Sequence, residues 1–488
     1  MTNKNISLII FIFFLSLYTL TMSGYIGNVD GEAMYNLTKN MLIKHDFSIE
    51  PGFIREVLGK VGIDGKFYAF YGVAQSLLAI PFYITGKFIS EFFPFSTREF
   101  VTRLSVVYLN VIITALWVML IFKFSLLLKF TKKVSLGLCF IFGLATMAWP
   151  YTKVFFSESS IGLFLTLALY YLIKYRSSRK KSDLFLSGAA LGFTLMFKLV
   201  IVLVLPLCLV YLKLNSKNEG IKKLLIPFLI ISFPVFCGLI FVGWYNFCRF
   251  GNPFETGYPN LFEPRVFFSG IYGFLLSPGK SIFIFSPILI SSLFVLKDFY
   301  NRYKLEALLF AGIFLIFLFV FSFWSGWDGG VCWGPRYMVP SIPLFVFPLG
   351  MFFIKRSLST KASKVVFTAF LIISVVVQLL PILVRYDIYI NKMGWTLATD
   401  FSWSKFTIFG HARQITELDL KPFNASIVNL NFHETAFKEQ FSRTIDIWYM
   451  YLLKFDSHKE LALLALLPLI SLFISGGLLI NKYRKCED

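Results

Sequence analysis

The feature that most constrains this chain is a succession of apolar runs, most of them about as long as a helix that crosses a membrane. They fall at residues 6–26, 71–92, 103–128, 133–149, 158–173, 183–197, 199–213, 224–246, 281–296, 305–323, 336–354, 364–384 and 459–481. Hydrophobic residues make up 57% of the 488 positions, which excludes an ordinary soluble protein. Because a segment in lipid must satisfy its own backbone hydrogen bonds, we predict an all-α polytopic membrane protein.

Clusters of Lys and Arg lie in the short loops between these runs, and such clusters mark the cytoplasmic side of a membrane. From Lys123 onward every second loop is basic, so the formal charge of +20 reports topology and gives no reason to expect nucleic acid. The alternation requires that the run 71–92, which contains Pro81, does not cross. We expect juxtamembrane or re-entrant helices there, which leaves about 12 spans with both termini cytoplasmic.

This topology divides the chain into three parts. Residues 1–384 form a transmembrane module with one long outer loop, 28–102. Residues 385–457 are more polar and form an external subdomain, and 458–488 supply the last span and a cytoplasmic tail. The six cysteines show neither paired nor metal-type spacing, so we expect no disulfide framework and no zinc site.

Two outer segments carry acids where a span leaves the membrane. Asp30 and Glu32 follow the first run, and Glu158 follows Ser157 at the start of a later one. Removal from water disfavours the charged form of a carboxylate, which makes it a plausible base near neutral pH. Two simpler interpretations stay open: Asp30 is a solvated boundary acid, and Glu158 is an acid stabilised by the dipole of its own helix.

Four outer cations run against the positive-inside bias, namely Lys198, Arg249, Lys280 and Arg336. Any one of them is accounted for by snorkelling to lipid headgroups. Together, beside Gly-rich turns and helix N-termini, they predict a phosphate site at the bilayer surface. Arg336 is the most informative, because a guanidinium in the first turn of a buried helix needs an anionic partner, for which Asp328 is one candidate.

The order of these features resembles the C-type membrane glycosyltransferase superfamily (GT-C), which includes protein O-mannosyltransferases and aminoarabinose transferases. The motifs at 71–82, 252–258, 277–280 and 333–337 resemble a bacterial branch that depends on polyprenyl-phosphate sugars. Relatives carry a lysine close to the tyrosine of the juxtamembrane stretch, whereas Phe70 precedes Tyr71 here and Lys66 is the nearest lysine. The family also often pairs two adjacent acids after the first span, which Gly31 separates in this chain.

The resemblance implies a GT-C-like bundle, with juxtamembrane helices in the first outer loop, and an inverting glycosyltransferase that acts on the external face. Asp30 would be the base, Glu158 would orient the acceptor or the sugar, and the donor phosphate would contact Lys198, Arg249, Lys280, Arg336 and Lys66. Further donor or acceptor contacts would be Glu32, Tyr35, Tyr71, Lys153, Asp328 and Tyr337.

The implied partners are a polyprenyl-phosphate sugar donor, a glycan, lipid or protein acceptor, and membrane lipids. The lipid carrier supplies the activated sugar, so no cofactor is required, although some relatives use a divalent cation. The location would be the cell (inner) membrane, with the site facing the periplasm or exterior.

Two other functions stay open. A transporter of polyprenol-linked lipid or polysaccharide would also use outer cations, and it predicts inverted repeats and charges within the spans. A polysaccharide polymerase or ligase of another fold would also have a large outer loop, but it gives no reason for acids at Asp30 and Glu158.

Overall fold

The computed structural model describes residues 3–50, 59–216, 221–258, 262–354, 360–392, 402–418, 444–453 and 456–484. In the transmembrane module the helices are α1 (Asn3–Thr21), α2 (Val29–Ile43), α4 (Ala74–Ser90), α5 (Phe95–Leu127), α6 (Lys132–Leu144), α7 (Glu158–Ser178), α8 (Lys181–Leu195), α9 (Val204–Asn215), α10 (Ile221–Phe250), α11 (Phe267–Leu276), α12 (Ile282–Phe285), α13 (Ile288–Leu293), α14 (Leu296–Arg302), α15 (Lys304–Ser322), α16 (Ile342–Ile354) and α17 (Lys361–Leu383). Beyond it lie α18 (Tyr386–Lys392), α20 (Thr407–Gln414), α22 (Trp448–Leu453) and α23 (Leu466–Arg484).

Short 3₁₀ helices connect several of these elements: η1 (Pro150–Thr152), η2 (Leu199–Leu203), η3 (Pro264–Val266), η4 (Arg336–Ser341), η5 (Trp403–Lys405), η6 (Ile415–Glu417) and η7 (Asp456–Ala465). The described residues contain one two-stranded sheet, in which β1 (Gly59–Val61) pairs antiparallel with β2 (Phe67–Ala69). The predicted fold class, an all-α polytopic membrane protein, is confirmed by this architecture.

Among the described residues, seven helical segments are long and apolar enough to cross a membrane. They are Asn3–Thr21, Arg98–Leu127, Lys223–Phe250, Lys304–Ser322, Arg336–Ile354, Lys361–Leu383 and Glu460–Arg484. Other predicted runs form shorter helices. The run 281–296 in particular, expected to be one span, is divided into α12, α13 and the start of α14. Pro287 explains the first break, because proline has no N–H to donate within a helix.

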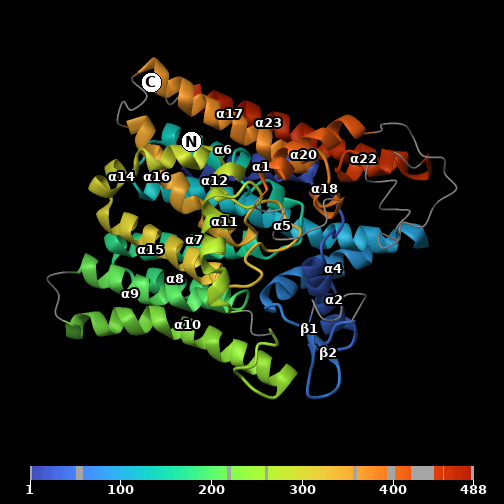
Figure 1. Cartoon of the computed structure of the whole chain (residues 1–488), viewed down its shortest axis with the longest axis horizontal. Helices are drawn as coiled ribbons and strands as arrows, with labels where there is room; N and C mark the ends of the chain where they lie inside the picture. The colour runs from blue at the N-terminus through green and yellow to red at the C-terminus, as the bar shows by residue number, and fades with distance from the viewer. Residues whose placement is uncertain are drawn as a thin grey trace.

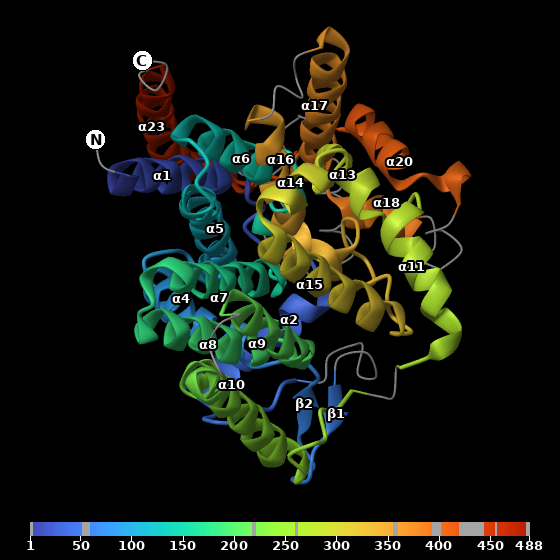
Figure 2. The ribbon, with the colours of Figure 1, turned by 90° about the vertical axis from the view of Figure 1, so that its left-hand side faces the viewer.

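The outer segments gather at one end of the molecule. In Figure 1 the β hairpin, α2, α4, α18, α20 and α22 lie to the right, whereas both chain termini lie toward the left. Figure 2 shows the same chain from its left-hand side, with α10 and the hairpin at one edge and α17 and α23 at the other.

The segment predicted to be juxtamembrane forms α4, a helix of 17 residues that contains Pro81. It packs along α5 and against α2. A Cβ on Gly86 would lie 2.6 Å from the Cβ of Ser105, so the two helices touch closely at that point. The helix places Tyr71, just before its start, next to α2.

Helices α8 and α10 pack through small residues, as is common between membrane helices. A Cβ on Gly192 would lie 2.3 Å from the carbonyl oxygen of Pro234, and one on Gly238 would lie 2.4 Å from that of Gly192. This contact fixes the end of α8, from which the chain continues to Lys198.

We expect Gly192→Ala to destabilise the protein by about 1–3 kcal/mol, because the new methyl group cannot fit against the backbone of α10. Thermal unfolding in detergent would show this as a lower Tm. The matched control is Gly477→Ala in α23, where a Cβ would meet nothing within 4 Å and the Tm should be unchanged or slightly higher. Equal melting of the two variants would contradict the predicted packing.

Candidate active site

Two ion pairs from four separate segments lie together at the outer end of the helices. Nη1 of Arg336 is 2.6 Å from Oδ2 of Asp30, and Nζ of Lys198 is 2.7 Å from Oε1 of Glu158. The structure therefore brings together the two acids and two of the four outer cations that the sequence singled out. It pairs Arg336 with Asp30, which lies 306 positions earlier in the chain.

The ring of Tyr337 joins the two pairs. Nζ of Lys198 lies 4.3 Å from its centroid and the guanidinium of Arg336 lies 4.9 Å from it. Nη2 of Arg336 also donates a hydrogen bond of 3.0 Å to the Tyr337 hydroxyl. The ring stacks on Phe321, with centroids 4.6 Å apart and planes at 10°. Both cations therefore lie within 4.9 Å of the centre of one aromatic ring, a favourable position for a positive charge.

Asp30 owes its position to a helix cap. The side chain of Asn28 accepts a hydrogen bond of 2.6 Å from the backbone N–H of Gly31, which begins α2 and places Asp30 in its first turn. A carboxylate there is stabilised by the positive end of the helix dipole.

The position of Arg336 depends on a glycine in the loop that precedes it. Gly329 has a φ of 72°. A Cβ at Gly329 would lie 2.7 Å from Cγ of Arg336, so the turn needs a glycine to leave room for the arginine.

Glu158 is positioned by a buried amide network that the sequence did not reveal. Nδ2 of Asn110 donates to the carbonyl oxygens of Val154, at 2.6 Å, and Phe156, at 2.8 Å, which holds the loop before α7. Gln75 donates to Asn110 at 2.9 Å and accepts from the Ser160 hydroxyl at 2.8 Å. The sequence does contain an indication of this network. Gln75 and Asn110 are amides inside apolar runs, where a polar group without a hydrogen-bond partner is costly.

The site leaves two polar atoms without partners among the described residues. Oε2 of Glu158 and Nε of Arg336 are buried and accept or donate no hydrogen bond. A buried polar group normally has a partner, so each of these atoms is available to a ligand. Burial lowers the pKa of Lys198, and the neighbouring Glu158 carboxylate acts in the opposite direction.

Tyr71 and Tyr258 complete the surroundings of Asp30. Burial, followed by the charge of Asp30, raises the pKa of Tyr71, so its phenol stays protonated and is able to donate a hydrogen bond. Tyr258 belongs to the motif at 252–258, and the sequence predicted no role for it. Burial raises the pKa of Tyr258, and after burial Tyr337 and Asp30 raise it most.

Other predicted phosphate contacts bind elsewhere. Arg249 is buried and donates to the Ala69 carbonyl oxygen at 2.5 Å and to Oδ1 of Asn246 at 2.7 Å. Lys280 donates to the Gly330 carbonyl oxygen at 2.8 Å, which ties down the loop that also contains the buried Asp328. Lys66 is exposed and pairs with Asp46 at 2.8 Å. The structure does not bring these three cations to the Asp30–Arg336 pair.

Glu32 and Tyr35 face a different arginine. Glu32 forms an ion pair with Arg103 of α5, and Nε of Arg103 lies 2.8 Å from Oε1 of Glu99. The Tyr35 hydroxyl donates to the same Glu99 oxygen at 3.0 Å, and its ring lies 4.5 Å below the Arg103 guanidinium. This network, which the sequence did not predict, fixes the first turns of α2 against α5.

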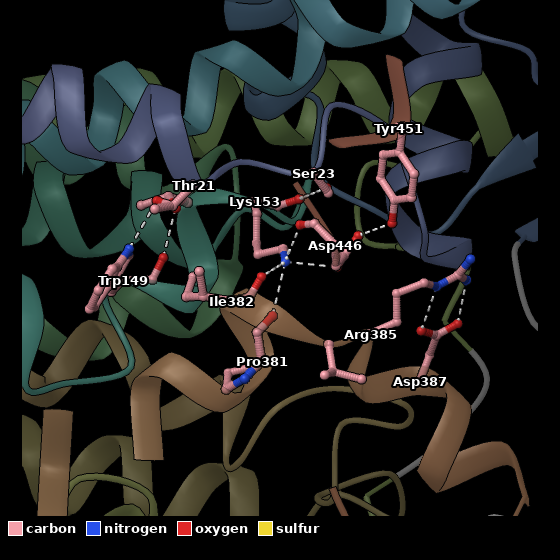
Figure 3. Close-up of polar contacts among 12 residues, drawn as sticks. Thr21, Ser23, Trp149, Lys153, Pro381, Ile382, Arg385, Asp387, Asp446 and Tyr451 are labelled. Atoms are coloured by element: carbon pink, nitrogen blue, oxygen red, sulfur yellow. Dashed lines mark hydrogen bonds and ion pairs between the residues drawn. The ribbon is translucent and has the colours of Figure 1, made fainter. Parts of the chain in front are cut away.

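Lys153 lies in a second buried cluster, shown in Figure 3. Its Nζ is 2.7 Å from Oδ2 of Asp446 and donates to the carbonyl oxygens of Pro381, Ile382 and Asp446 at 2.9, 3.0 and 2.9 Å. The Tyr451 hydroxyl donates to Oδ1 of Asp446 at 2.5 Å. Burial lowers the pKa of Lys153, opposed by Asp446. These contacts fasten the segment before α22 to the ends of η1 and α17.

The external segment also reaches the site through His411 of α20. Its ring lies 5.1 Å from that of Trp333, three residues before Arg336. Nε2 is 3.1 Å from the Val384 carbonyl oxygen, and the other ring nitrogen has no partner among the described residues. Burial lowers the pKa of His411 to about 4.

No family model matches the chain, and no curated protein matches it. The solved structures to which the chain is similar include the crystal structures of ArnT from Cupriavidus metallidurans bound to undecaprenyl phosphate and in the apo state. Their sequences are 13% and 14% identical, 84% of this chain is covered in both, 74% and 79% of theirs is covered, and the TM-score is 0.45 for each.

Within the parts of the chain that the structure describes, no three His, Cys, Asp or Glu side chains come together as a metal site would require.

We expect the stability contributed by His411 to decrease as the pH falls from about 6.5 toward 4. The unfolded histidine has a pKa of about 6.5, so the folded state, with the lower value, binds fewer protons in this interval and acidification favours unfolding. The loss should reach about 3 kcal/mol at the acid end. Thermal unfolding across this pH range, in wild type and His411→Gln, measures it: the wild type should lose more Tm than the variant, and parallel curves would contradict the prediction.

Proposed function

We propose that this protein is an integral-membrane inverting glycosyltransferase, which moves a sugar from a polyprenyl-phosphate donor to an acceptor hydroxyl on the external face of the membrane. The observation that carries the proposal is the meeting of the Asp30–Arg336 and Glu158–Lys198 pairs over one tyrosine ring, with Nε of Arg336 unpaired among the described residues. Two cations supply the charge that one phosphate needs, and a carboxylate beside them supplies a base.

The phosphate of the donor would lie between Lys198 and Arg336. Arg336 has a free Nε–H to offer, and a phosphate oxygen competes with Asp30 for its Nη1. Arginine suits this position, because its planar fork matches the geometry of phosphate. The lipid tail would lie among the apolar side chains of the spans.

The reaction is a single displacement. The acceptor oxygen attacks the anomeric carbon and forms the new glycosidic bond, while the bond from that carbon to the phosphate oxygen breaks. The electron pair stays on the leaving phosphate, whose growing charge Lys198 and Arg336 stabilise. Asp30 accepts the proton of the acceptor hydroxyl, and the unpaired Oε2 of Glu158 orients that hydroxyl or one on the sugar. The products are a glycosylated acceptor and a polyprenyl phosphate.

We expect Asp30→Asn to lower turnover about 10²- to 10⁴-fold, the contribution typical of a general base. Donor binding should be kept, because the amide no longer competes as an anion for Arg336. Transfer by purified protein in detergent, assayed with a panel of polyprenyl-phosphate sugars and with and without a chelator, tests both points. The matched control is Asp64→Asn, a change of an exposed carboxylate in the β-hairpin turn.

Normal turnover by Asp30→Asn would show that Asp30 is a boundary acid and would end this mechanism. If the wild type consumes no donor, donor binding must be measured directly. Absence of both transfer and binding would favour the transporter alternative.

We expect Arg336→Gln to weaken binding of undecaprenyl phosphate at least tenfold, since it removes a charge-assisted contact of about 1.5–3 kcal/mol. Arg336→Lys should restore only part of the affinity, because an ammonium cannot make the two parallel hydrogen bonds of the guanidinium. Binding is measured by calorimetry in detergent, with Arg265→Gln, an exposed arginine in η3, as the control. Unchanged affinity in both Arg336 variants would place the phosphate elsewhere.

A further inference from the structure

Tyr258 stands beside the site without a role in the reaction described above. Its ring lies 5.2 Å from that of Phe70, with planes at 31°, and 5.4 Å from that of Trp324, nearly at right angles. Phe70 directly precedes Tyr71, and Trp324 begins the loop that leads to Arg336. Tyr258 therefore joins the two segments that flank the Asp30–Arg336 pair.

Burial raises the pKa of Tyr258. After burial, Tyr337 and Asp30 raise it most, whereas Arg336 lowers it. Tyr258 also raises the pKa of Tyr71, where it ranks after burial and Asp30 as a cause. None of the described residues forms a hydrogen bond with the Tyr258 hydroxyl, so this donor and acceptor is available.

The loop that carries Tyr258 is held by specific contacts. Nδ2 of Asn246 donates to the Pro253 carbonyl oxygen at 3.1 Å, and Oε1 of Glu255 accepts from the backbone N–H of Gly257 at 2.8 Å. Gly257 has a φ of 82°, and a Cβ there would lie 2.6 Å from the Phe250 ring. This turn needs a glycine, and it ends at Tyr258, whose ring contacts Phe70 and Trp324.

We propose that Tyr258 is a specificity-determining residue that binds the sugar of the donor, a hexose or pentose with free hydroxyls. This inference rests on the proposed function, which places the donor phosphate between Lys198 and Arg336 and hence the sugar next to it. Sugars present apolar C–H faces and hydroxyls that both donate and accept. A tyrosine offers an aromatic face to the first and a hydroxyl to the second. Tyr337, which accepts a hydrogen bond from Arg336, offers a further phenol at the site.

The experiment compares two ligands that differ only in the sugar: undecaprenyl phosphate and undecaprenyl phosphate carrying a hexose or pentose. Affinities are measured for wild type, Tyr258→Phe and Tyr258→Ala, with Tyr300→Phe, a half-exposed tyrosine of α14, as the control. Tyr258→Phe should bind the sugar-bearing ligand about five- to tenfold more weakly, the effect of one lost hydrogen bond. Tyr258→Ala should lose more, and the bare phosphate should bind all four proteins equally.

The outcomes separate this inference from the proposed function. If the wild type binds and transfers a donor and both Tyr258 variants do the same, the role of Tyr258 is wrong and the function stands. Equal weakening of both ligands would also overturn the role, because the residue would then act on the phosphate or the fold. A wild type that binds neither ligand would overturn the proposed function, and this inference with it.

Discussion

The ion pair between Arg336 and Asp30 is the interaction on which the rest of the site depends. A guanidinium in the first turn of a membrane helix is costly unless an anion lies beside it. Asp30 supplies that anion from the first turn of α2, and the pair connects elements at opposite ends of the chain at a distance of 2.6 Å. Lys198 lies against the same tyrosine ring as Arg336 and pairs with Glu158. The position of Arg336 therefore also determines how α7 and α8 lie relative to α2.

Charge and hydropathy predicted much of this from the sequence. The alternation of basic loops indicated which segments share a side, and that placed Asp30, Glu158, Lys198 and Arg336 at one end before any contact was known. Hydropathy could not predict which polar groups pair across helices. Gln75 and Asn110 meet only when α4 packs along α5, and Glu32 and Arg103 meet only when α2 lies against α5.

The same reasoning could not separate ligand-binding cations from structural ones. Lys153, Arg249 and Lys280 are also buried cations in outer segments, but carbonyl oxygens and Asp446 satisfy them within the protein. Arg336 differs from these cations because its hydrogen bonding among the described residues is incomplete: its Nε is buried and unpaired, as is Oε2 of Glu158. A sequence shows that a cation needs partners, whereas only the structure shows whether it has enough of them.

This incompleteness bears on how donor binding and catalysis would be coupled in the proposed reaction. Without donor, two acids and two cations balance each other, and Asp30 is engaged by Arg336. A phosphate adds negative charge and draws the guanidinium toward itself, which weakens its hold on Asp30. Asp30 would then be free to accept a hydrogen bond from the acceptor hydroxyl, so that hydroxyl would be engaged only beside a bound sugar.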